Sequence, residues 1–183
     1  AMPKLPEAMA VSEAKPENLR VHIRGSHLTL GEETPRQFPR ILVGDSQSPI
    51  VGEKSGRLDL AQWMTRAENP LTARVMVNRI WQHHFGRPLV PTPSDFGFRG
   101  TPPTHPELLD WLAVEFMDQG WRMKPIHRLI VTSQAYRLAS SGDTAVVGAN
   151  ATVDPENLRY WRANTLRLDA EVVRDSVLAV GGS

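Results

Sequence analysis

The hydrophobic period of the chain changes near residue 56, and this change indicates the fold class. After residue 56, apolar residues recur every three or four positions in several separate runs. This spacing places them on one face of an α-helix. Before residue 56 the sequence is rich in proline and glycine, which interrupt helices and favour extended segments and turns. We therefore predict a mainly α-helical domain preceded by an extended, proline-rich arm with one or two short β-strands.

About five helices are expected, and short signals mark their ends. Asn69 can cap a helix in which Pro70 occupies the first turn, and Gly86 can end it. Thr104 and Glu107 have the spacing of a capping box, in which each side chain pairs with a free backbone N–H. The two long stretches between helices, residues 86–104 and 139–153, predict loops. The helices are expected at residues 57–67, 70–85, 105–119, 124–138 and 168–180.

The first third of the chain predicts strands and a linker. Residues 19–25 alternate apolar and polar side chains and end in glycine, which is typical of a β-strand. A second short strand is expected near residues 41–43. Residues 1–18 are polar and contain three prolines, so we expect a linker or an expression-derived arm. The expected organisation is an arm (1–18), an extended β-containing segment (19–56) and a helical domain (57–183), together a piece of a larger multidomain protein.

The composition excludes several classes of site and partner. With no cysteine, the chain has no disulfide, no thiolate zinc site and no covalent c-type haem attachment. A net charge of +1, without a basic stripe, makes nucleic acid an unfavoured partner. No apolar run approaches the roughly 20 residues that span a bilayer. We expect no metal or cofactor within this chain.

Two adjacent histidines near the end of the second predicted helix have different environments. Neighbouring residues on a helix point about 100° apart, so His83 and His84 cannot easily ligate one metal together. His84 aligns with Val77 and Ile80 in the apolar stripe and is expected in the core. His83 lies on the flank of that stripe, and of the two it is the candidate for function.

The charged residues fall in blocks of alternating sign. Residues 69–94 and 119–142 contain arginine but no Asp or Glu, whereas residues 105–119 contain four acids and no Lys or Arg. The blocks either neutralise one another on packing or leave some Arg and His side chains in a cleft that binds an anion, because a buried arginine needs a partner. The candidate cleft residues are Arg74, Asn78, Arg79, His83, Asp95, His127 and Arg128.

Familiar catalytic motifs are missing from the sequence. Asp95-Phe96-Gly97 has the letters of the kinase magnesium motif, but His127-Arg128 is followed by leucine and no glycine-rich phosphate loop occurs. The sequence also lacks a Walker loop, a GxSxG elbow and a dinucleotide-binding fingerprint. Whether the chain is an enzyme is therefore left open.

Several long stretches resemble a known family. They are NPLTARVMVNRIWQHHFG (69–86), SDFG (94–97), THPELLDWLA (104–113), KPIHRLIVTSQAYR (124–137) and RLDAE (167–171). Together they closely resemble the planctomycete cytochrome-associated domain family of unknown function. The resemblance implies a large exported parent protein, in which a haem-c-like domain and a planctomycete-specific domain precede this one. It implies no catalytic residues, and any haem belongs to a neighbouring domain.

Three hypotheses for function follow. The first is an interaction or scaffolding module whose partners are the neighbouring domains of the same exported protein. The second is an enzyme or an anion-binding domain that uses the Arg- and His-lined cleft. The third is support of electron transfer, in which His83 or His127 lies near a haem on a neighbouring domain as an axial ligand or a hydrogen-bond donor.

Overall fold

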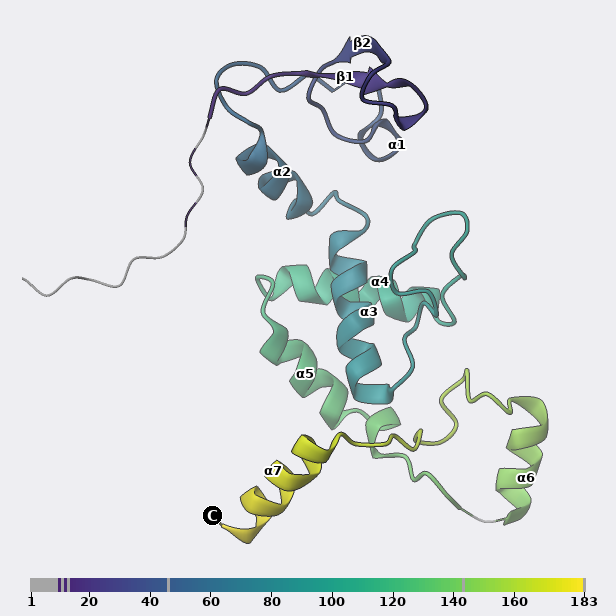
Figure 1. Cartoon of the computed structure of the whole chain (residues 1–183). Coiled ribbons are helices and arrows are strands. Elements are labelled where there is room, and N and C mark those ends of the chain that lie inside the picture. The colour runs from purple at the N-terminus through teal and green to yellow at the C-terminus, as the bar shows by residue number, and fades with distance from the viewer. Residues whose placement is uncertain (1–9, 11, 13, 46, 143, 183) are drawn as a thin grey trace, which may run out of the picture. The chain divides into compact units, whose positions relative to one another are not determined.

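The chain is mainly helical with one small sheet, as the sequence predicts (Figure 1). The computed structural model describes residues 10, 12, 14–45, 47–142 and 144–182. Most of the predicted N-terminal arm, residues 1–9, 11 and 13, lies outside this part of the chain. The chain divides into two compact units, residues 1–70 and 71–183, and each is described by itself.

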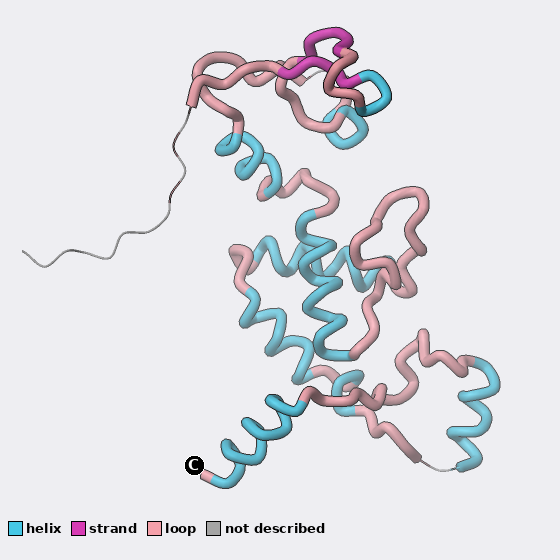
Figure 2. Tube along the Cα trace, viewed as in Figure 1, coloured by secondary structure: helices cyan, strands magenta, loops and turns pink. Residues whose placement is uncertain are grey.

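The first unit contains a hairpin and two short helices. Strands β1 (Leu19–His22) and β2 (Leu30–Thr34) pair antiparallel, with Leu19 opposite Thr34 (magenta in Figure 2). The strand expected at residues 41–43 is wrong, because these residues form the single helical turn α1 (Arg40–Val43). Pro39 precedes this turn, and its fixed φ suits a helix start. The unit ends with helix α2 (Arg57–Met64).

The second unit is built on three packed helices, α3 (Thr72–Phe85), α4 (Pro106–Asp118) and α5 (Met123–Thr132). Each of the three contacts the other two, as Figure 1 shows. Their apolar stripes face one another and, with two loop residues, form the hydrophobic core. The buried core residues are Ala73, Val77, Ile80, Trp81, Phe85, Leu89, Val90, Leu109, Leu112, Ala113, Phe116, Ile126 and Ile130.

The predicted helix ends agree only in part with the structure. Helix α3 ends at Gly86, whose φ of 73° is the left-handed conformation that favours glycine. The predicted capping box does not form: α4 has no side-chain cap, and the Thr104 hydroxyl donates to the Leu89 carbonyl at 3.2 Å. Thr104 therefore ties the preceding loop to the core instead of starting the helix.

The C-terminal half contains one helix that the sequence pattern does not predict. The stretch 139–153 was predicted as a loop, but residues 144–153 form α6 (Thr144–Val153). Its three alanines favour a helix and outweigh Gly148 and Asn150. Helix α5 is shorter than expected and is followed by the 3-10 turn η2 (Ala135–Arg137). The last helix, α7 (Ala170–Gly181), lies close to its predicted position.

Candidate functional site

Arg74 and Asn78, two of the seven candidate cleft residues, are held by hydrogen bonds to other elements of the fold. The Arg74 guanidinium donates from Nε to Asp110 Oδ1 at 2.6 Å, which joins α3 to α4. For this pair, the blocks of opposite charge neutralise each other. Asn78 is fully buried, donates from Nδ2 to the Val90 carbonyl at 3.2 Å and accepts the Val90 N–H at 2.8 Å. Asn78 therefore holds the loop that follows α3 against the core.

The structure does not gather the other candidates around these two. Arg79, His83 and Arg128 are exposed. Asp95 is exposed and accepts the Gly97 N–H at 2.9 Å, which closes a local turn. Arg74 lines a hollow of about 400 Å³ beside the loop at residues 96–103, and the other six candidates are not among the residues that line it.

The seventh candidate, His127, pairs with a histidine that the sequence assigned to the core. His84 Nε2 and His127 Nδ1 lie 2.7 Å apart, a hydrogen bond between α3 and α5. Both side chains are half-buried. The Tyr136 ring meets the His84 ring edge-on, with the centroids 5.6 Å apart. Burial first, and then the neighbouring His127 and His83, lower the pKa of His84 below its ordinary value, so the neutral imidazole is favoured.

A second polar network, centred on Tyr160, was not predicted. The Tyr160 hydroxyl accepts a hydrogen bond from Trp81 Nε1 at 2.8 Å and donates to the Arg87 carbonyl at 3.1 Å. Burial raises its pKa, with smaller opposing effects of the Trp81 hydrogen bond and the Arg87 charge. Asn164 donates to the Phe85 carbonyl at 3.0 Å. These bonds fasten residues 160–164 to the end of α3.

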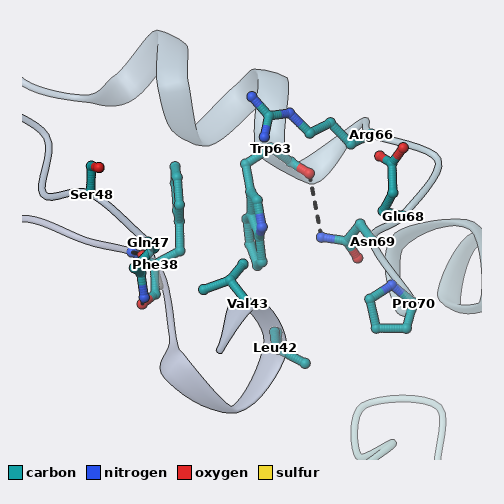
Figure 3. Close-up of a pocket in the computed structure, with 10 residues that line it drawn as sticks. All are labelled: Phe38, Leu42, Val43, Gln47, Ser48, Trp63, Arg66, Glu68, Asn69 and Pro70. Atoms are coloured by element: carbon teal, nitrogen blue, oxygen red, sulfur yellow. Dashed lines mark hydrogen bonds between the residues drawn. The ribbon is translucent and has the colours of Figure 1, made fainter. Parts of the chain in front are cut away.

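The first unit contains a hollow of about 790 Å³ (Figure 3). The Phe38 and Trp63 rings stack with centroids 5.0 Å apart and planes 11° from parallel. Gln47 holds Phe38 in place by accepting its N–H at 2.9 Å and donating to its carbonyl at 2.8 Å. On the other side of Trp63 lie charged and polar residues, among them Arg66 and Asn69 (Figure 3).

The lining of this hollow mixes apolar and polar groups. Its lining combines two aromatic rings and apolar residues with amides, one hydroxyl and one charge of each sign, the mixture that noncovalent binding sites use. It contains no histidine and one hydroxyl, Ser48. The lining residues are Phe38, Leu42, Val43, Gln47, Ser48, Trp63, Arg66, Glu68, Asn69 and Pro70.

Helix α7 carries an exposed apolar face. All twelve of its residues are exposed. Val173, Val177 and Val180 share one face because they are three or four residues apart. Their exposed fractions are 46%, 66% and 90%. No helix within the described residues has the length and apolarity to cross a membrane.

Fold and surface together define a small, mainly helical domain. The chain belongs to the family described as PSD1, Protein of unknown function (DUF1553), whose model matches residues 56–183. The resemblance to a family of unknown function is thus confirmed, whereas planctomycete origin and cytochrome association stay predictions. Comparisons with curated proteins and with solved structures found no match.

Proposed function

We propose that this chain is an interaction module that packs against a neighbouring domain of a larger protein through the valine face of α7. The observation that carries the proposal is the exposure of every residue in this helix. An amphipathic helix normally buries its apolar stripe. A helix as short as twelve residues is also marginal in water without packing. A partner surface would bury this apolar stripe and supply the packing that the helix lacks.

The free energy available on such a surface is substantial. The exposed fractions of Val173, Val177 and Val180 are 46%, 66% and 90%, which together equal roughly two fully exposed valines. Burial of a valine side chain contributes about 1.5–2 kcal/mol, so covering this face stabilises the complex by about 3–4 kcal/mol. This is a considerable share of the ~5–15 kcal/mol that stabilises a typical domain.

The first unit supports a role as an interaction module by a separate observation. Among its described residues, only Gly56 and Asn69 are buried, and neither contributes an apolar side chain. Both strands of its hairpin are exposed, apart from partial cover at Gly31. A hairpin of two strands is marginally stable in water unless further strands or a helix cover it. The unit therefore also needs a partner surface.

The identity of the neighbouring domains follows from the resemblance. We extend the proposal to an exported, cytochrome-linked protein, in which the partner domains belong to the same polypeptide. The support is the likeness of the five stretches quoted above to planctomycete cytochrome-associated proteins. In such a protein a neighbouring domain holds the haem, because this chain has no cysteine for covalent attachment.

The alternative of an anion-binding cleft has less support. Arg74, one of its central candidates, already pairs with Asp110. Arg79 and Arg128 are exposed, where water solvates their charge and no ligand is needed to balance it. The proposal of a module requires no such ligand.

Site-specific crosslinking in the intact polypeptide tests the proposal. A photoreactive phenylalanine analogue at position 177 should crosslink to another domain, whereas the same group at position 175 should not. Asp175 is the matched control because it lies on the opposite face of α7 and is also exposed. Absence of a crosslink from position 177, or equal yields from the two positions, would contradict docking through the valine face.

A further inference from the structure

The pair formed by His84 and His127 is a half-buried cluster of metal-ligating side chains that the proposed module does not use. We propose that His84 Nε2 and His127 Nδ1 together bind a divalent transition-metal ion of the Zn²⁺, Ni²⁺ and Cu²⁺ class, held between α3 and α5. These ions favour imidazole nitrogen, whereas Mg²⁺ and Ca²⁺ take oxygen ligands. The site differs from a pairing of His83 with His84, which the helix geometry disfavours.

The distance between the two nitrogens is close to the distance between two imidazole ligands of one metal ion. They face each other at 2.7 Å. Two zinc–nitrogen bonds of about 2.0–2.1 Å at a tetrahedral angle place the nitrogens roughly 3.3 Å apart. The rings must therefore separate by about 0.6 Å, which small side-chain rotations provide. The metal would replace the single proton that the two nitrogens share in the hydrogen bond.

The surroundings hold the two rings in place. His84 lies on α3 and His127 on α5, and both helices contribute to the core. The Tyr136 ring meets the edge of His84, with centroids 5.6 Å apart, and also contacts the Phe85 ring at 5.8 Å. A ligand pair that is already positioned loses less conformational freedom when the metal arrives.

The number of ligands sets the character of the site. Within the described residues, no group of three His, Cys, Asp or Glu side chains converges on one point. The protein therefore supplies two ligands, and the half-exposed position of the pair leaves the other coordination positions to water or to an exchangeable ligand. Such an open arrangement is typical of weak or catalytic sites and not of closed structural ones.

Thermal unfolding of the tag-free chain with and without Zn²⁺ or Ni²⁺ tests the inference. At a concentration one hundred times Kd, the ion should raise Tm by about 5 °C or more. The rise should disappear in His84→Ala and in His127→Gln, and should persist in His83→Ala, which removes an exposed histidine next to the pair. Mg²⁺ should have no effect.

Imidazole nitrogen NMR of the unaltered chain identifies the binding atoms directly and avoids the risk that a variant fails to fold. Zn²⁺ should shift the resonances of His84 Nε2 and His127 Nδ1 and leave the His22, His27 and His105 resonances in place. A Tm rise that survives in both folded variants, an equal rise with Mg²⁺, or no shift of these two nitrogens would overturn the inference.

Discussion

Replacement of Asn78 by alanine is expected to destabilise the chain strongly. The Asn78 side chain is 0% exposed and makes two hydrogen bonds to the backbone of Val90, which is itself 2% exposed. In the variant, both the N–H and the C=O of Val90 lose their partner inside the core. Each unpaired buried group costs about 1–3 kcal/mol, so the free energy of unfolding should fall by about 3 kcal/mol.

Equilibrium unfolding in urea, followed by circular dichroism, measures this loss. With an m-value of about 2 kcal/mol/M, the midpoint should move down by about 1.5 M. Arg79→Ala is the matched control, because Arg79 is the next residue of α3 and is exposed; its effect should stay within about 0.5 kcal/mol. If Asn78→Ala cost less than about 1 kcal/mol, the structural role would be refuted.

Three further outcomes are expected. His84→Ala should lower the free energy of unfolding by about 1–2 kcal/mol through loss of its hydrogen bond to His127. His83→Ala should change it by less than about 0.5 kcal/mol. Equal losses of Tm in the two variants would contradict the different roles of the two histidines. Because the folded state lowers the pKa of His84, its contribution is complete above the ordinary value of 6.5 and is lost as the pH falls below it. In metal-free buffer, Tm should therefore fall with acidification more steeply in the unaltered chain than in His84→Ala. Gly86→Ala should lower the free energy of unfolding by about 1 kcal/mol or more, because φ at Gly86 is 73° and an added Cβ would meet the Leu166 side chain. The urea midpoint measures this loss. An unchanged midpoint would show that the turn tolerates a side chain.

The helices that the sequence predicted are those with strong local signals. Helices α3 and α4 combine an apolar stripe with proline near the start, and α3 also has glycine at its end, so neighbouring residues suffice to place them. Helix α6 carries no clear apolar stripe and contains Gly148 and Asn150. The helix-favouring and helix-disfavouring residues nearly cancel, so the sequence pattern does not predict this helix. The turn α1 is a single turn between Pro39 and Gly44, too short for a period to be read.

The site residues were harder to predict because their partners are distant in sequence. Blocks of charge predicted either neutralisation between helices or an anion-binding cleft, and the Arg74–Asp110 pair is an example of the former across 36 positions. Nothing local pairs His84 with His127, which are 43 positions apart and meet only because α3 and α5 pack together. The Trp81–Tyr160 bond spans 79 positions and depends in the same way on the tertiary fold.

The most direct test of the proposed interaction module is amide hydrogen exchange in α7, measured in the 183-residue chain and again in the intact polypeptide. In the chain alone, α7 amides should exchange almost as fast as unprotected ones, while α3 amides stay protected by the core. In the intact polypeptide, α7 should gain protection. Equal exchange of α7 in both samples, or protection of α7 equal to that of α3 in the chain alone, would contradict the account.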